Sequence, residues 1–350
     1  MGFTVVYFTM IEIVNQKKFI ELMDEYSFKV VDIKKLRPNK SYETLFNNRD
    51  YLLQVLKDEN DQIPRDILEY CLCTLCDSTT SLEIMKKDGF SIVECSNCQL
   101  VYVNPRLKKE LYLESYMSHN YGHVINELAL SSHEYRKKRF GQERVEFIEC
   151  YLDLNLKKEL LDIGSASGFF MEAAAERGWS CTGIELSQVA LDFSRKRGNN
   201  VLSQPLENLD FQRNAFSVVT MFDVLEHLHN PDQTLQIIGK ILQPGGLLYI
   251  YVPNWNSASR LLIGQDSHFI WPTHHLTYFT PKTISLFLQK YGFEIVAMET
   301  NGLDFEDWNW QLEEQGVSFT FFKNKLDELQ FLANSAGWGK NLRVMARKSG

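Results

Sequence analysis

The 350-residue sequence predicts an α/β fold with a parallel sheet, on two main observations. From about residue 135 onward, short hydrophobic strands alternate with helices, which is the pattern of a sheet covered by helices. A turn of small residues joins a strand at 160–163 to a helix at 169–177. Further strands are expected at 179–186, 201–203, 216–221, 247–252, 293–298 and 341–347, and further helices at 134–151, 187–197, 232–242 and 282–291.

The turn after the first of these strands has the features of a nucleotide site. In Asp162-Ile-Gly-Ser-Ala-Ser-Gly168, the glycines Gly164 and Gly168 let a ligand approach the backbone, and the next helix begins with free N–H groups. A dinucleotide fingerprint needs glycine at 164, 166 and 169, where this chain has Ala166 and Phe169 at the last two. Asp162 favours a ligand with an ammonium group and no phosphate, and S-adenosylmethionine is one.

A second acidic residue, Glu185, ends the next predicted strand, one helix and one strand after the turn. A carboxylate at that place can accept hydrogen bonds from both ribose hydroxyls of a nucleoside. The turn and Glu185 together predict a nucleoside site at the carboxyl edge of the sheet.

Four motifs in this order resemble the class I S-adenosylmethionine-dependent methyltransferases over roughly residues 135–348. They are Asp162-x-Gly164-x-x-x-Gly168, Glu185, Phe222-Asp-Val-Leu-Glu226-His-Leu and Leu242-Gln-Pro-Gly-Gly246. The resemblance implies a seven-stranded Rossmann-like sheet with helices on both faces and a last strand antiparallel beside the sixth. It implies cofactor contacts from Asp162, Gly164, Ser165, Ala166, Gly168, Glu185, Leu186, Leu206, Glu207, Phe222 and Asp223. Pro205 stands where the family has an aspartate for adenine, so Leu206, Glu207 or backbone groups are expected to take that contact.

Candidate catalytic residues follow the fourth and fifth strands. Asp223, Glu226 and His227 come after the fourth strand, and ligands bind at the carboxyl ends of strands in open α/β sheets. His275 maps onto a His-Leu-x-x-Phe segment of the resembling enzymes and is the first candidate for a base that takes the acceptor proton. The alternative for His275 is a structural histidine bonded to a backbone carbonyl. His274 is expected to be the exposed member of the pair.

Two cysteine pairs, Cys73-x-x-Cys76 and Cys95-x-x-Cys98, predict a ribbon that binds Zn²⁺ through four thiolates. A hairpin with Asp88-Gly89 as its turn is expected between the pairs. Cys71 leaves open which two of the first three cysteines are ligands. The ribbon and the Leu-Val-x-x-Asn-Pro-Arg segment after it resemble a bacterial methyltransferase subgroup that acts on sugars and secondary metabolites, which implies a structural zinc far from the chemistry. Disulfides and a ribbon without metal are the alternatives.

The chain divides into four expected regions. They are an N-terminal α/β extension at 1–70, the zinc ribbon at 71–106, a lid or linker at 107–134 and the methyltransferase domain at 135–350. In the extension, strands are expected at 4–14 and 27–33 and helices at 17–26 and 49–58. Residues 301–336 are expected to form a substrate wall or a surface for a homodimer.

Composition narrows the classes of function. Lys and Arg total 37 against 45 for Asp and Glu, a net charge of −8 that argues against nucleic acid as a partner. No apolar run reaches the roughly 18 residues of a membrane span, and the N-terminus does not resemble a signal peptide, so a cytoplasmic protein is expected. We expect methyl transfer to a small acceptor, first a hydroxyl of a sugar or polar metabolite. An RNA methyltransferase with a zinc finger and an inert S-adenosylmethionine-binding partner subunit are the alternatives.

Overall fold

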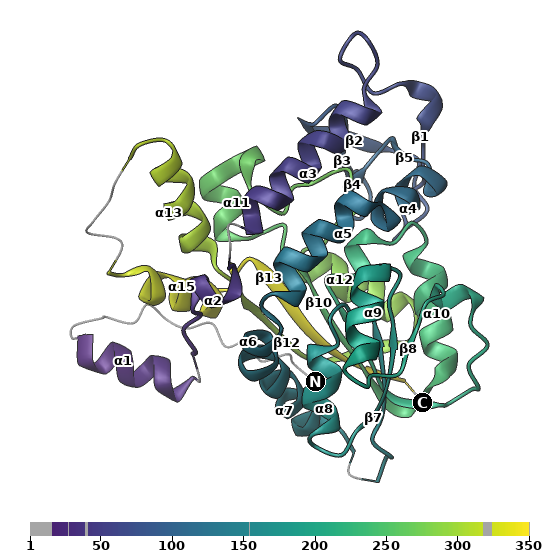
Figure 1. The fold of residues 1–350 in the computed structure, drawn as a ribbon, viewed down its shortest axis with the longest axis vertical. Coiled ribbons are helices and arrows are strands. Elements are labelled where there is room, and N and C mark those ends of the chain that lie inside the picture. The colour runs from purple at the N-terminus through teal and green to yellow at the C-terminus, as the bar shows by residue number, and fades with distance from the viewer. Residues whose placement is uncertain (1–15, 27, 39–40, 154, 318–323, 350) are drawn as a thin grey trace.

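The computed structural model describes residues 16–26, 28–38, 41–153, 155–317 and 324–349 (Figure 1). Its centre is a seven-stranded sheet, as the resemblance implies, and the strand order is β12-β13-β10-β9-β6-β7-β8. Strands β6 to β10 are parallel where they pair, and β13 is antiparallel to both β10 and β12. The strands are β6 (Glu159–Ile163), β7 (Ser180–Ile184), β8 (Val201–Leu202), β9 (Phe216–Phe222), β10 (Leu242–Pro253), β12 (Phe293–Asn301) and β13 (Asn341–Lys348).

Helices cover both faces of this sheet because successive strand side chains point to opposite sides. On one face, Leu160 and Val218 pack with buried residues of the helices that precede and follow β6. On the other face, Leu161 and Val219 pack with the helices that follow β9 and β11. The helices are α7 (Gln142–Tyr151) and α8 (Phe169–Ala175) on the first face, and α10 (Pro231–Ile241) and α12 (Pro281–Lys290) on the second; α9 (Gln188–Lys196) shares a cluster with α8.

The single helix expected at 134–151 is interrupted by a wider turn. It consists of α6 (His133–Arg136), a π-helical segment at Lys137–Gly141 and α7. π-helical segments inside helices are frequent at functional sites, and Phe140 in this one points toward the cavity described below. Val145 and Ile148 of α7 are buried against the sheet.

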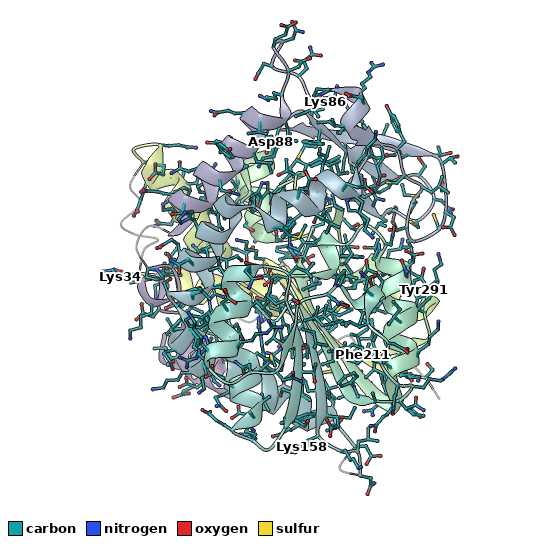
Figure 2. The ribbon with its side chains drawn as sticks, turned by 45° about the vertical axis from the view of Figure 1, so that its right-hand side comes forward. Lys34, Lys86, Asp88, Lys158, Phe211 and Tyr291 are labelled. Carbon is teal, nitrogen blue, oxygen red and sulfur yellow. The ribbon has the colours of Figure 1, made fainter. Side chains whose placement is uncertain are left out.

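The cysteine region forms a second, four-stranded sheet in the order β11-β4-β3-β2. Asp88 and Gly89, with φ of 54° and 87°, form the predicted turn of its hairpin. Figure 2 places Lys86 and Asp88 of this hairpin at the opposite end of the molecule from Lys158. The strands are β2 (Ser81–Lys87), β3 (Phe90–Cys95), β4 (Val101–Val103) and β11 (Thr277–Tyr278), and β1 (Leu68–Glu69) pairs separately with β5 (Arg106–Leu107). Because β11 comes from the methyltransferase region, the ribbon sheet is completed from far along the chain.

The N-terminal region is helical where the structure describes it. Helix α1 confirms the prediction at 17–26, and α3 begins earlier than the helix predicted at 49–58. The strand predicted at 27–33 is wrong for the described residues 28–33, because the Asp32 side chain accepts a hydrogen bond from the Lys35 amide and begins a helix there. The strand predicted at 4–14 lies outside the described residues. The helices are α1 (Gln16–Glu25), α2 (Ile33–Leu36) and α3 (Ser41–Leu56).

The remaining helices lie over the carboxyl edge of the sheet and along β12 (Figure 1). The ring of Phe331 is in edge contact with Phe19, 5.5 Å between centroids, so the 301–336 region packs on the N-terminal helices. None of the helices in the described ranges has the length and apolar character needed to span a membrane. These helices are α4 (Lys109–Met117), α5 (His119–Ile125), the π-helical segment Asn126–Leu130, α11 (Ala258–Ile263), α13 (Asp304–Glu314) and α15 (Leu326–Ser335).

Candidate functional site

The turn after β6 requires both of its glycines. Gly164 and Gly168 have φ of 72° and 77°, a region that side chains disfavour. A Cβ atom on Gly164 would lie 2.5 Å from a methyl of Val224, and one on Gly168 would lie 2.3 Å from the Ser194 hydroxyl. The turn is therefore packed between the segment after β9 and helix α9.

Glu185 ties this turn to the start of α9. Its Oε2 accepts a hydrogen bond from the Ala166 amide at 2.9 Å, and its Oε1 accepts one from the Ser187 amide at 2.7 Å. Burial raises the pKa of Glu185, and these amides oppose that effect. Each oxygen has lone pairs beyond those used here, so the carboxylate can also accept ribose hydroxyls.

Asp162 lies at the end of β6 and is 2% exposed. Its Oδ1 accepts a hydrogen bond of 2.6 Å from the Thr220 hydroxyl on the adjacent strand β9. Burial raises the pKa of Asp162 to about 7. A cationic ligand at this edge would favour the ionised carboxylate.

The other residues expected at the cofactor are Ser165 in the turn, Leu186 after β7, and Leu206 and Glu207 after β8. Leu186 is half-buried after β7, and Leu206 is buried in the same core cluster as Ile184. Ser165 is buried, and its hydroxyl has no hydrogen-bond partner among the described residues. Glu207 pairs at 3.3 Å with Lys109 of α4.

Phe222, also expected at the cofactor, points toward α7 and α8. Its ring is in edge contact with Phe170 and Tyr249. The Arg144 guanidinium lies 4.0 Å from the Phe222 ring centroid. Arg144 has no motif around it in the sequence, and the prediction missed it.

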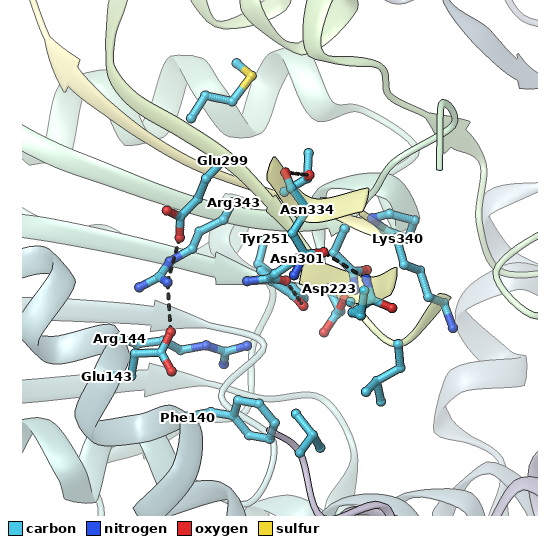
Figure 3. Close-up of a pocket in the computed structure, with 18 of the residues that line it drawn as sticks. Phe140, Glu143, Arg144, Asp223, Tyr251, Glu299, Asn301, Asn334, Lys340 and Arg343 are labelled. Carbon is cyan, nitrogen blue, oxygen red and sulfur yellow. Dashed lines mark hydrogen bonds and ion pairs between the residues drawn. The ribbon is translucent and has the colours of Figure 1, made fainter. Parts of the chain in front are cut away.

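A cavity of about 2190 Å³ opens at Asp223, where β9 ends. Figure 3 shows Phe140 and Arg144 from the α7 side, and Tyr251 and Asn301 from the sheet, around this cavity. The Tyr251 hydroxyl donates a hydrogen bond of 2.7 Å to Asn301. Because β9 is adjacent to β6, Asp223 lies between the glycine turn and the cavity. Asp223 has a φ of 56°, and the surrounding protein raises its pKa.

The cavity also has a charge network around the buried Arg343 that the sequence did not predict. The Arg343 Nη1 atom lies 2.9 Å from a Glu143 oxygen and 2.8 Å from a Glu299 oxygen (Figure 3). The Arg343 guanidinium lies 3.8 Å from the Phe147 ring centroid. These residues are far apart in the sequence, so no local pattern reveals the network.

The candidate catalytic residues Glu226, His227 and His275 lie together, and the two histidines line another wall of the cavity. One carboxylate oxygen and one nitrogen of each histidine lie within 4.8 Å of one another. A hydrogen bond of 2.8 Å from the Leu276 amide to the Glu226 carbonyl joins the two segments that carry them. Burial raises the pKa of Glu226 well above its usual range and lowers that of His227 to about 4. Burial also holds the pKa of His275 well below its usual range.

His274 and two tyrosines of the predicted lid support this cluster. His274 is 1% exposed, so the prediction that it is exposed was wrong; its ring stacks on Trp271. The Tyr112 hydroxyl lies 2.7 Å from the carbonyls of His227 and His274, and the Tyr116 hydroxyl contacts the His227 ring. The lid region thus contacts the histidines, which its polar sequence alone could not indicate.

The four predicted zinc ligands come together at the end of the ribbon sheet that lies away from its hairpin turn. The Sγ atoms of Cys73 and Cys98 are 3.4 Å apart, those of Cys76 and Cys95 are 3.5 Å apart, and all four lie within 4.8 Å of one another. Thiolates around tetrahedral Zn²⁺ lie about 3.8 Å apart, so the arrangement fits the ion. The amide of Cys71 binds Asn104, and Cys71 is outside this group.

The sheet order, with antiparallel β13 between β10 and β12, and the glycine turn after β6 define the class I methyltransferase fold. Residues 132–298, slightly under half of the chain, match the family described as methyltransferase domain. This region is therefore a methyltransferase domain.

Curated relatives share part of this region. The ubiquinone biosynthesis O-methyltransferase of Idiomarina loihiensis is 36% identical over 126 residues, which is 34% of this chain and 52% of that protein. The protein of the same name from Azoarcus sp. is 27% identical over 172 residues, 44% of this chain and 72% of that protein. The chain thus spans about half the length of the Idiomarina relative. A solved structure of an S-adenosylmethionine-dependent methyltransferase from Archaeoglobus fulgidus is 20% identical, with a TM-score of 0.46, over 65% of this chain and 100% of that chain.

Proposed function

We propose that this protein transfers a methyl group from S-adenosylmethionine to an oxygen of a small-molecule acceptor. The observation that carries the proposal is the position of Asp223, between the glycine turn after β6 and the large cavity. The turn suits the cofactor and the cavity suits the acceptor. The two ligands would then meet at the end of β9.

Different residues around the turn contact different parts of the cofactor. Glu185 accepts the ribose hydroxyls, and Asp162 with the first amides of α8 after Gly168 holds the methionine end. Leu186 and Leu206 offer apolar contacts for the adenine. Asp223 faces the sulfonium, because a carboxylate at the mouth of the cavity stabilises a nearby positive charge.

The reaction is an in-line displacement. The acceptor oxygen forms a bond to the methyl carbon as the carbon–sulfur bond breaks, the acceptor loses its proton, and S-adenosylhomocysteine leaves. Holding both reactants in a near-attack geometry supplies most of the rate. His275 is the first candidate to take the proton, with His227, Glu226 and Asp223 as alternatives, because the low pKa of His275 keeps it unprotonated at neutral pH.

The acceptor is proposed to be a hydroxyl of a sugar or another polar metabolite. The names of the curated relatives support transfer to oxygen, and the polar groups of Tyr251, Asn301 and Lys340 on the cavity wall suit a hydroxylated molecule. Aromatic rings such as Trp271 line the same cavity and suit a ring-shaped acceptor. A cytoplasmic location and a homodimer stay predictions.

We also propose that Cys73, Cys76, Cys95 and Cys98 hold one structural Zn²⁺. The spacing of their sulfur atoms supports this ligand set over one that includes Cys71. Four thiolates leave no open position, so the ion would stabilise the ribbon and take no part in the reaction.

The test of the cofactor site is calorimetric titration with S-adenosylmethionine and S-adenosylhomocysteine. Wild type is expected to bind both in the micromolar range, and Glu185→Ala to bind at least about 30-fold more weakly, because two charge-assisted hydrogen bonds are lost. Asp192→Ala is the matched control, since Asp192 is an exposed carboxylate on α9 outside the expected cofactor contacts. No binding by wild type would contradict the proposed activity. Equal binding by Glu185→Ala would contradict only the ribose assignment.

A further inference from the structure

Glu226 has a buried carboxyl group that no described residue satisfies. Its side chain is 1% exposed, and neither oxygen has a hydrogen-bond partner in the described part of the chain. The nitrogen Nε2 of His227 is 3.7 Å from Oε1, which is beyond hydrogen-bond distance. A buried carboxylate is costly unless a cation or a donor meets it. The position is therefore suited to a bound cation.

The two neighbouring histidines are fixed with their other nitrogens available. The Nδ1 atom of His227 lies 2.9 Å from the His274 carbonyl, and that of His275 lies 2.6 Å from the Phe269 carbonyl. A carbonyl only accepts hydrogen bonds, so each Nδ1 carries the proton and each Nε2 keeps a lone pair. A histidine that donates from one nitrogen to a carbonyl is the usual arrangement of a metal-binding histidine.

We propose that Glu226, His227 and His275 bind a divalent metal ion through one carboxylate oxygen and two Nε2 atoms. These atoms already lie within 4.8 Å of one another. Oxygen and nitrogen ligands of a zinc-sized ion lie about 3.4 Å apart, so a small rotation of the side chains closes the site. One carboxylate with two imidazoles suits Zn²⁺, Mn²⁺, Fe²⁺ or Co²⁺.

The site is fixed by three separate parts of the chain. Glu226 and His227 lie in the short helix after β9, and His275 comes just before β11. The Tyr112 hydroxyl of α4 bonds to carbonyls of both histidine segments. Such outer contacts hold ligands in place before the metal binds.

The open positions of the ion would face the acceptor. His227 and His275 line the large cavity, and Glu226 lies behind them. A metal ion there binds the acceptor hydroxyl oxygen and lowers its pKa, so that the proton passes to water and the oxygen attacks the methyl carbon. This role rests on the proposed methyl transfer, but metal binding itself does not. In this arrangement His275 is a metal ligand instead of the base.

Titration of the zinc-loaded full chain with Mn²⁺, followed by electron paramagnetic resonance of the free ion, tests the site. Mn²⁺ prefers oxygen and nitrogen ligands, so the thiolate ribbon does not compete, and wild type is expected to bind about one Mn²⁺ per chain. In Glu226→Gln and His275→Gln the dissociation constant is expected to rise more than about 100-fold. His123→Gln, which changes an exposed histidine, is expected to bind like wild type.

Binding of S-adenosylmethionine by the same variants shows whether they are folded. Should either variant lose that binding too, the absorption of Co²⁺ added to zinc-loaded wild type decides the matter. A d–d band without a thiolate charge-transfer band supports the site, and a thiolate band overturns it. The proposal is also overturned if wild type takes up no metal beyond the ribbon, or if both variants bind Mn²⁺ like wild type. Failure to bind S-adenosylmethionine in wild type would overturn the proposed function and leave the metal result intact.

Discussion

Ala166 and Gly168 lie two residues apart in the turn after β6, with φ of 45° and 77°. Asp223, at the end of β9, has a φ of 56°. Positive φ at residues with side chains is strained, and such strain gathers at binding sites that the surrounding structure holds in place. The sequence revealed the glycines, but it could not reveal that Ala166 and Asp223 share this conformation.

Gly168→Ala is expected to lower the free energy of unfolding by about 2–4 kcal/mol, because a positive φ and a contact of 2.3 Å with the Ser194 hydroxyl coincide. Urea denaturation measures the change. Gly178→Ala is the matched control, since Gly178 has a φ of 82° and nothing lies within 4 Å of its Cβ position. The control is expected to lose only about 1 kcal/mol. An equal loss in both variants would contradict the packing argument.

At the scale of elements, the two strand residues of β11 connect the ribbon to the histidine cluster. Thr277 pairs with Tyr102 and Tyr278 pairs with Val101, so β11 is the edge strand of the ribbon sheet. His275 lies two residues before β11. The ribbon sheet is therefore completed by two residues from the region expected as the methyltransferase domain. The short pairing is invisible in the sequence because its partners are far apart.

Cys98→Ser is expected to lose the ribbon zinc and to lower methyl transfer at least about tenfold, because a loosened β4 no longer holds β11 and His275 in place. Affinity for S-adenosylmethionine should change little, since the glycine turn lies on β6. Metal analysis, a methyl-transfer assay and calorimetry measure the three quantities. Cys71→Ser, outside the sulfur cluster, should match wild type in all of them. A fully active Cys98→Ser without zinc would refute the link.

At the scale of the whole molecule, Asp307 joins regions that are distant in the sequence. It is 1% exposed and pairs with Arg37 of the N-terminal region at 3.0 Å and with Lys340 before β13. Burial opposes ionisation of Asp307, but Lys340 and Arg37 outweigh it and hold its pKa well below the usual range. The N-terminal helices are thereby attached to the 301–336 region.

Asp307→Asn is expected to lower the free energy of unfolding by about 3–5 kcal/mol at pH 7, because it removes a buried negative charge between two cations. The pKa of Asp307 is lowered on folding, so its contribution is complete above about pH 5 and declines as the pH falls below about 4. Urea denaturation at pH 7 and pH 3 measures this, and the difference from wild type should shrink at pH 3. Asp210→Asn, an exposed change, is the control. A difference independent of pH would contradict the assignment.

The sequence by itself determined the central sheet, the glycine turn and the two cysteine pairs, because hydrophobic period, small residues and ligand spacing are local properties. Only the tertiary structure decided that β11 completes the ribbon sheet, that Tyr112 supports the histidines, and that Glu226, His227 and His275 come together. These features depend on contacts between segments far apart in the chain. Such contacts follow from how the packed elements are placed, and no pattern of neighbouring residues encodes them.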